Sequence, residues 1–211
     1  LYILFRKEKP YAVHSLTPKA GLLSMIAARA AKVPVRVHTF TGLIFPWKKG
    51  FIKKILKNMD RLTCLAATNI IPEGQGIRKD LMTNRITKKL SDVLGNGNIN
   101  GIDLEYFKPV PKISYNTVTR FIFVGRIVHD KGINELKEAF ERLDNAELVL
   151  VGPFEHELDP LNDDCQQWIK GDNRVISVGF KDDIRPYLAQ ADVFVFPSHR
   201  EGFPNTPLQA G

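Results

Sequence analysis

The sequence predicts an α/β protein of two domains, each with a parallel β-sheet flanked by helices. Short apolar runs alternate with segments of helical spacing, a pattern typical of βαβ units. The stretch KPVPKISYNT interrupts this alternation, and the charge balance reverses there. Residues 1–110 hold 19 basic and 7 acidic residues, whereas residues 111–211 hold 11 and 16. We predict a first domain at 1–110, a linker at 111–119 and a second domain at 120–211.

Composition indicates a globular protein in a reducing compartment. Of the 211 residues, 44% are apolar and 25% are charged, which excludes a disordered chain. No apolar run reaches the roughly 20 residues that cross a bilayer, and no signal peptide is visible. Cys64 and Cys165 match no metal spacing and are interpreted as two unpaired thiols. The chain begins at Leu1, inside an expected helix end, and is interpreted as a fragment of a longer cytoplasmic protein.

Elements of the first half follow from apolar periodicity. Two helices are expected, one after the Thr17-Pro18 pair and one where apolar residues recur between Phe51 and Leu62. Four runs are predicted as strands: YAVHSL (11–16), VRVHTF (35–40), RLTCLAA (61–67) and SDVLGNG (91–97).

The second half repeats the pattern. Helices are expected at NELKEAFERL (134–143) and IRPYLAQA (184–191), and another begins as the sequence ends. Four runs are predicted as strands: RFIFVGR (120–126), AELVLVG (146–152), RVISVG (174–179) and VFVFPS (193–198).

Chemistry-bearing residues follow several of these strands. Ligands of open parallel sheets bind beyond the carboxyl ends of the strands. Arg126 comes directly after one strand and Lys131 lies five residues on, a pair that suits a diphosphate. By itself this pair is better explained by a solvated loop, because most loop lysines and arginines bind nothing specific. Phe180 follows another strand and is interpreted either as a platform for a planar base or as a packed side chain.

The last strand leads into a polar turn. Glu201 is placed where a carboxylate accepts hydrogen bonds from two sugar hydroxyls, and Gly202 permits close backbone approach. Gln209 lies eight positions beyond Glu201 and is expected to face the same cleft. Together the strand ends offer an anion site, a hydroxyl site and a base platform, which is what a nucleotide-sugar requires.

Several motifs in order resemble one known family. FVGRIVHDKGI is similar to the strand and loop of family 4 glycosyltransferases, and SHREGFPNTPLQAG resembles their paired-glutamate signature. GNGNINGIDLEYF and PYAVHSLTPKAGLLSMIAARAAKVPVRVHTFTG resemble segments of their N-terminal domain. The resemblance covers nearly the whole chain. It implies a GT-B fold of two Rossmann-like domains, both incomplete here, and a metal-independent enzyme that retains anomeric configuration.

The resemblance also implies roles for single residues. Arg126 and Lys131 match the pair that neutralises the donor diphosphate, where negative charge builds as the sugar–phosphate bond breaks. Glu201 matches the carboxylate that orients the donor sugar. The other donor-binding positions are Gly125, Phe180, Gly202, Phe203, Pro204, Asn205, Thr206 and Gln209.

Two positions depart from the family pattern. Gln209 replaces the second glutamate, and its amide oxygen can still accept a ribose hydroxyl. The histidine before Gly42 is replaced by Thr41, with His38 three positions earlier. Thr41, His38 and Gly42 are named as possible sugar contacts, although a histidine inside a strand is more often packed than catalytic.

The basic half suggests a membrane partner. Lys48, Lys49, Lys53, Lys54 and Lys57 accompany the apolar helix at residues 51–62. We interpret its apolar stripe (Phe51, Ile52, Ile55, Leu56, Met59 and Leu62) as core, with lysines that are solvated and able to touch an anionic membrane. Nucleic-acid binding is the rival that a pI of 9.4 raises, but no recognition helix or ribonucleoprotein motif is present.

We therefore predict a hexosyltransferase that uses a UDP- or GDP-sugar, with no cofactor or metal and no nucleic-acid partner. The expected acceptor is a saccharide or lipid-linked saccharide of bacterial surface polysaccharide, met at the inner face of the membrane. A non-catalytic nucleotide-sugar-binding relative is the alternative. The 211 residues alone are expected to turn over poorly, because part of each sheet is expected to be absent.

Overall fold

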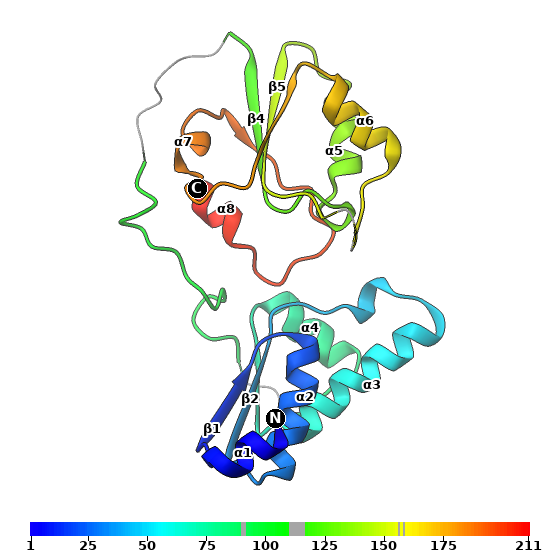
Figure 1. Ribbon diagram of the computed structural model, residues 1–211, viewed down its shortest axis with the longest axis vertical. Coiled ribbons are helices and arrows are strands. Elements are labelled where there is room, and N and C mark those ends of the chain that lie inside the picture. The colour runs from blue at the N-terminus through cyan, green and yellow to red at the C-terminus, as the bar shows by residue number, and fades with distance from the viewer. Residues whose placement is uncertain (90–91, 110–116, 156, 158) are drawn as a thin grey trace. The chain divides into compact units, whose positions relative to one another are not determined.

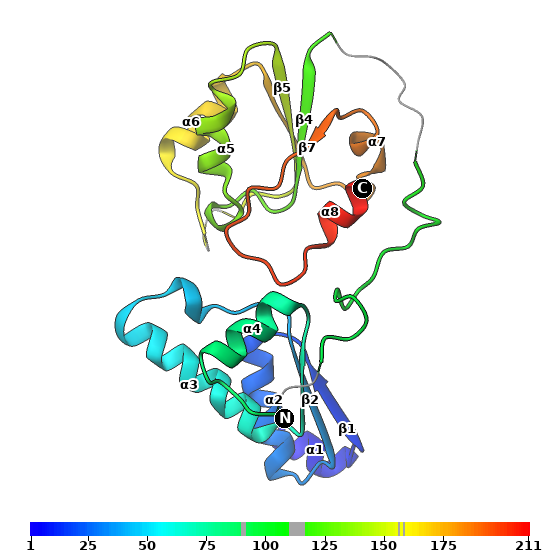
Figure 2. The same ribbon diagram turned by 180° about the vertical axis from the view of Figure 1, so that it is seen from behind.

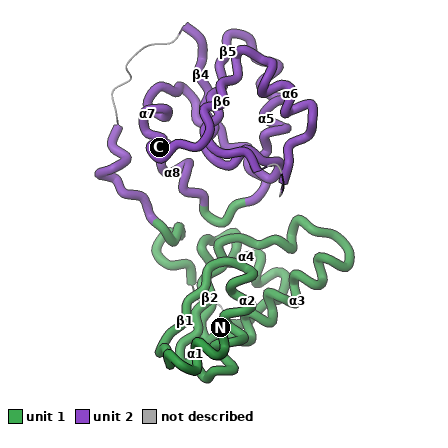
Figure 3. Tube along the Cα trace, viewed as in Figure 1, with its two compact units in different colours: residues 1–100, 201–203 green, residues 101–200, 204–211 purple. Residues whose placement is uncertain are grey.

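A computed structural model describes the chain except residues 90–91, 110–116, 156 and 158. The chain divides into two compact units (Figure 3). Unit 1 comprises residues 1–100 and 201–203, and unit 2 comprises residues 101–200 and 204–211. The linker predicted at 111–119 lies largely outside the described residues.

Unit 1 contains a three-stranded parallel sheet in the order β1-β2-β3 (Figure 1). β2 (Val35–Phe40) is central and pairs with β1 (Ala12–Ser15) on one side and β3 (Asn69–Pro72) on the other. The helices are α1 (Tyr2–Glu8), α2 (Pro18–Ala30), α3 (Gly50–Ala66) and α4 (Gln75–Thr83), and a 3₁₀ turn spans Phe45–Trp47. Their shared core includes Met25, Phe40, Phe45, Ile70 and Leu81.

Two strand predictions in this unit are wrong. RLTCLAA is the last part of α3, where Thr63 donates from its hydroxyl to the Met59 carbonyl within the helix (3.0 Å). The strand itself begins at Asn69. Residues 92–97 form no strand, because Gly95 and Gly97 adopt positive φ angles of 55° and 93° that end an extended segment.

The prediction for the apolar stripe of α3 is also wrong. Phe51, Ile52 and Ile55 are exposed, and so is Leu62. Leu56 is the member of the stripe that packs against the core cluster of unit 1. The helix is therefore anchored by its buried C-terminal turns, while apolar side chains near its start face solvent.

Unit 2 contains a four-stranded parallel sheet in the order β6-β5-β4-β7. Its strands are β4 (Thr119–Val124), β5 (Ala146–Val151), β6 (Val175–Gly179) and β7 (Val193–Phe194). Its helices are α5 (Ile133–Phe140), α6 (Asp163–Gly171), α7 (Arg185–Leu188) and α8 (Asn205–Ala210), and a 3₁₀ turn spans His129–Lys131. The α/β class with parallel sheets is thus confirmed, although α4 and α6 were not predicted.

Alternation along the strands divides the core of unit 2 into two layers. Phe123 and Leu150 belong to the layer under α5 and α6. Ile122 and Val149 belong to the opposite layer, which α7 covers. Figure 2 shows α7 on the side of the sheet away from α5 and α6.

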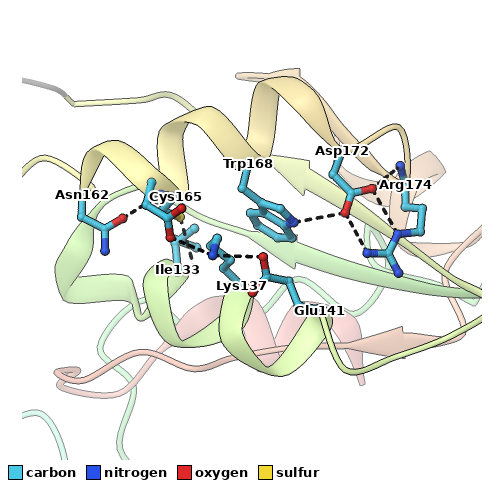
Figure 4. Close-up of polar contacts among 9 residues, drawn as sticks. Ile133, Lys137, Glu141, Asn162, Cys165, Trp168, Asp172 and Arg174 are labelled. Carbon is cyan, nitrogen blue, oxygen red and sulfur yellow. Dashed lines mark hydrogen bonds and ion pairs between the residues drawn. The ribbon is translucent and has the colours of Figure 1, made fainter.

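Polar contacts fix α6 at both ends (Figure 4). The Asn162 side chain accepts a hydrogen bond from the Cys165 backbone N–H (2.7 Å) and so caps the helix start. At the other end, the Trp168 indole donates to Asp172 (3.2 Å). Asp172 also pairs with Arg174, whose hydrogen bonds lower the pKa of Asp172 to about 2.

None of the described helices combines the length and apolar character that a bilayer span requires.

Candidate functional site

Glycines form the carboxyl edge of the unit 2 sheet. Gly125, Gly152 and Gly179 lie at the ends of β4, β5 and β6. The Gly125 backbone N–H donates to the carbonyl of Val151 in β5, and the Gly152 N–H donates to the Gly179 carbonyl (both 2.9 Å). A Cβ on Gly152 would overlap the Gly125 carbonyl. This edge of the sheet is therefore main chain, open to a ligand that needs close backbone approach.

Arg126 projects from this edge and pairs with a carboxylate. Its guanidinium donates to Glu155 across 2.6 Å, and both side chains are partly exposed. An anionic ligand of Arg126 would compete with Glu155. Sequence reasoning missed Glu155, because its partner Arg126 follows a different strand and is 29 residues away in the chain.

Lys131 lies in a loop that is tied to the segment after β7. Gly132, at φ 73°, packs against the Pro197 carbonyl so closely that a side chain there would clash. Two contacts of Asp130 reinforce the tie. The His199 backbone N–H donates to the Asp130 carbonyl (3.0 Å), and the Arg200 guanidinium pairs with the Asp130 carboxylate (2.9 Å).

This loop and the segment before α6 together form a cluster of residue types that can bind a metal. His129, Asp130 and Asp159 place their candidate ligand atoms within 4.8 Å of one another. The Asp159 carboxylate already accepts the Asp130 backbone N–H (2.7 Å), and Asp130 pairs with Arg200. These contacts explain the cluster as a junction between two loops. That the protein needs no metal for activity stays a prediction.

A cavity of about 440 Å³ lies within unit 2 beside the glycine edge. Four of the residues singled out from sequence share its lining: Gly125, Arg126, Phe180 and Gln209. The Phe180 ring is 67% exposed, so it is not the packed side chain of the alternative interpretation. The described lining does not include Lys131.

Two aromatic residues that sequence reasoning missed, Tyr106 and Phe107, also line the cavity. Tyr106 and Phe107 pack edge to face, with ring centroids 5.1 Å apart. The Arg185 guanidinium lies 3.7 Å from the centre of the Tyr106 ring and donates to the Tyr106 carbonyl (3.1 Å). These contacts attach the segment that precedes β4 to the start of α7.

In unit 1, Thr41 and Gly42 follow β2, and Glu73 follows β3. The Thr41 hydroxyl donates to the Leu16 carbonyl (3.3 Å). Gly202 belongs to the same unit, and a Cβ there would meet the Thr41 carbonyl and the Glu73 carboxylate. Thus Gly202 lies close to main chain, as a glycine permits.

Glu73 is a buried carboxylate that sequence reasoning missed. Burial raises its pKa, and the neighbouring Glu201 carboxylate raises it further. Hydrogen bonds from the backbones of Ile99 and Phe203 oppose the shift. Glu73 directly follows β3, but the strand was predicted at 61–67, so its position after a strand end could not be recognised from the sequence.

His38 is a packed residue. It is 1% exposed, and its Nδ1 lies 2.9 Å from the Ser15 hydroxyl. Burial lowers its pKa to about 4, so the ring is neutral at pH 7. The backbone of Gly21 also abuts the ring. The ring therefore offers no surface to a sugar, and of the two alternatives Thr41 is the one that a ligand can reach.

The remaining predicted positions divide between the units. Glu201 and Phe203 group with unit 1, whereas Arg126 and Lys131 belong to unit 2. Pro204 precedes α8, which begins with Asn205 and Thr206 and carries Gln209. The convergence of Glu201 with Arg126 and Lys131 on one ligand stays a prediction.

Comparison with known proteins identifies relatives over the whole chain. Residues 118–211 match the family described as glycosyl transferases group 1. The chain is 34% identical, over 222 aligned positions, to the capsular polysaccharide biosynthesis glycosyltransferase CapM of Staphylococcus aureus, covering 100% of the chain and 58% of CapM. It is 31% identical to the Escherichia coli UDP-Gal:alpha-D-GlcNAc-diphosphoundecaprenol alpha-1,3-galactosyltransferase, covering 100% of the chain and 57% of the enzyme. The chain thus spans somewhat more than half the length of these relatives.

Solved structures share the fold at lower identity. HepE of Anabaena, in complex with UDP and glucose, superposes with a TM-score of 0.79 at 19% identity, covering 99% of this chain and 59% of HepE. Sucrose-phosphate synthase of Thermosynechococcus elongatus gives 0.78 at 19% identity, covering 99% and 55%. The expected GT-B fold is confirmed, and residues 118–211 carry a domain that matches the glycosyl transferases group 1 family.

Proposed function

We propose that the protein transfers a hexose-type sugar from a UDP-sugar to a lipid-linked saccharide of bacterial surface polysaccharide, with retention of anomeric configuration. The observation that carries the proposal is the cavity that joins Gly125, Arg126, Phe180 and Gln209 within the unit matched by the family. These groups supply a main-chain edge, a cation, an aromatic face and an amide.

Each group suits one part of the donor. The guanidinium of Arg126 binds diphosphate oxygens in place of Glu155 and neutralises the charge that develops on the leaving group. The exposed Phe180 ring offers a face to the base, and Gln209 accepts a ribose hydroxyl. Lys131 adds a second positive charge, and Glu201 orients the sugar. No metal takes part, because Arg126 and Lys131 supply the charge that a divalent ion would supply.

Relatives support the donor and the acceptor class. The E. coli relative is named for UDP-Gal and a diphosphoundecaprenol acceptor, and HepE was solved with UDP and glucose. We therefore favour UDP over GDP, and a polyprenyl-diphosphate-linked saccharide as acceptor.

A thermal-shift panel on the full chain tests the donor assignment. UDP and UDP-hexoses should raise the melting temperature in proportion to the logarithm of ligand concentration, and GDP should raise it less. No shift with any nucleotide would refute the proposal.

A turnover assay separates the second candidate function. Gln209 in place of a glutamate and the burial of His38 favour a relative that binds nucleotide-sugar without transferring it. Release of UDP that depends on a lipid-linked saccharide supports the transferase. Tight UDP binding without acceptor-dependent release supports the binder. The assay uses the full-length protein, because the 211 residues alone are expected to turn over poorly.

A further inference from the structure

The turn at residues 201–203 packs closely on the ends of β2 and β3 within unit 1. A Cβ on Gly202 would overlap the Thr41 carbonyl and would lie 2.5 Å from the Glu73 carboxylate. The Gly202 carbonyl in turn lies 3.6 Å from the place that a Cβ on Gly74 would take. The turn therefore fits against the residues that follow these two strands at a distance that only glycine permits.

Further contacts hold Phe203, the last residue of this turn. The Asn98 side-chain amide donates to the Phe203 carbonyl (3.4 Å), and the Asn98 backbone N–H donates to the Glu73 carbonyl (3.2 Å). A Cβ on Gly97 would lie 2.8 Å from the Phe203 ring. The segment at residues 97–99 therefore fixes Phe203 and Glu73 relative to each other.

The Glu73 carboxylate completes these contacts as an acceptor. Glu73 is 8% exposed, and its side chain accepts the backbone N–H groups of Ile99 and Phe203. Its main chain is fixed as well, because the Glu73 N–H donates to the Phe40 carbonyl (3.0 Å). An ionised carboxylate has acceptor positions alone and so satisfies both N–H groups. A protonated carboxyl carries an O–H donor, which would compete with one of them.

The ionisation of Glu73 is coupled to the turn. Burial is the main reason that the pKa of Glu73 is raised, and the negative charge of Glu201 raises it further. The two N–H groups oppose this rise, because they favour the ionised form. Thr41, Gly97 and Asn98, which also pack on Glu73 or its carbonyl, carry no charge. The ionised form is therefore lost at a higher pH than in an ordinary glutamate.

We propose that Glu73 is a positioning residue, whose carboxylate holds Ile99 and Phe203 and thereby sets the orientation in which Glu201 meets the donor hexose. Glu73 acts through the turn and not by touching the substrate. The inference rests on the proposed function, because there Glu201 is the group that orients the sugar. Turnover should therefore need Glu73 in its ionised form, whereas UDP binding in the cavity of unit 2 should not.

Backbone amide signals of the chain provide a local readout. An N–H proton that donates to a carboxylate changes its chemical shift when that carboxylate titrates. In an acid titration followed by heteronuclear NMR, we expect Ile99 and Phe203 to report one shared pKa above 4.5, the ordinary value for a glutamate. Both responses should be absent in Glu73→Gln. Glu138→Gln makes the same exchange at an exposed position of α5 and should leave both responses in place.

Kinetics of the full-length protein separate positioning from a general loss of stability. Glutamine keeps one acceptor oxygen and adds N–H donors, so Glu73→Gln imitates the protonated carboxyl at every pH. It should lower kcat/KM for a UDP-hexose by about tenfold or more, as expected for the loss of one hydrogen bond to a charged group. It should also remove the Glu73 ionisation from the acid side of the pH profile. The Kd for UDP should stay unchanged, and Glu138→Gln should match the wild type throughout.

The outcomes separate this proposal from the proposed function. A Phe203 amide that does not titrate in the wild type, or whose titration survives Glu73→Gln, would overturn the role of Glu73, whatever the activity. Wild-type kcat/KM and pH profile in Glu73→Gln would overturn it as well. Equal losses of UDP affinity and kcat/KM in that variant would make Glu73 a structural residue and so count against positioning. Failure of the wild type to bind UDP would instead count against the proposed function.

Discussion

The Arg126–Glu155 pair allows a prediction in which one substitution strengthens ligand binding. Arg126 must leave Glu155 before it can hold a diphosphate, so Glu155→Gln should raise affinity for UDP. The two side chains are 47% and 31% exposed, and pairs of this kind contribute about 0.2–1 kcal/mol. The expected gain is therefore about 1.4- to 5-fold in Kd by isothermal titration calorimetry.

The companion substitution should act in the opposite direction. Arg126→Met removes charge-assisted hydrogen bonds worth about 1.5–3 kcal/mol, which corresponds to roughly 10- to 150-fold weaker UDP binding. In the Arg126→Met background, Glu155→Gln should have no further effect, because the competition no longer exists. An unchanged benefit in that background would refute the reasoning.

A second Arg–Glu pair provides the control. Arg120 and Glu147 pair across β4 and β5 at the opposite ends of these strands from the glycine edge. Glu147→Gln makes the same chemical change far from the cavity. It should leave the Kd for UDP unchanged.

Other predictions concern stability and chemistry. Gly152→Ala should lower the free energy of unfolding in urea by several kcal/mol, because its Cβ would overlap the Gly125 carbonyl and its φ is 149°. The control Gly171→Ala has open space around its Cβ and should be neutral or slightly stabilising. The His38 pKa is about 4 in the fold and 6.5 in the unfolded chain, so the unfolded chain binds the proton more readily. The free energy of unfolding should therefore be unaffected by His38 above pH 6.5 and should fall by roughly 3 kcal/mol as the pH drops towards 4. Asp60, whose pKa burial raises to about 6, acts with the opposite sign, so Asp60→Asn should steepen acid destabilisation, and an unaltered pH profile would contradict this. Transfer activity of the full-length protein should persist in excess EDTA, and its loss with recovery on Mg²⁺ addition would show that Arg126 and Lys131 do not suffice.

Apolar periodicity predicted the central strands β2, β4 and β5, because they are parallel and largely buried. VRVHTF coincides with β2, and RFIFVGR covers β4 except for its first residue, Thr119. The failure at RLTCLAA has a physical cause, because a short apolar run has the same composition in a buried strand and in a buried helical turn. Only packing decides, and here Thr63 and Ala66 face the core as part of α3.

The candidate site was predictable where its residues directly follow strands, and less so elsewhere. Arg126 and Phe180 were found by that rule and share the cavity of unit 2. Glu155 and Tyr106 were missed, because their roles depend on partners 29 and 79 residues away. The exposure of Phe51, Ile52 and Ile55 on α3 was also missed. Periodicity gives the presence of an apolar face but not whether another element covers it.

The three glycines at the edge of the unit 2 sheet have a practical consequence for redesign. Because that wall of the cavity is peptide backbone, exchanging side chains there would break the strand ends before it altered what the cavity accepts. Substitutions at Tyr106, Phe107 and Phe180, the aromatic residues that line the cavity, would instead change its shape without disturbing the strand ends. A library of variants aimed at new ligands should therefore vary these three aromatic residues and keep the three glycines constant.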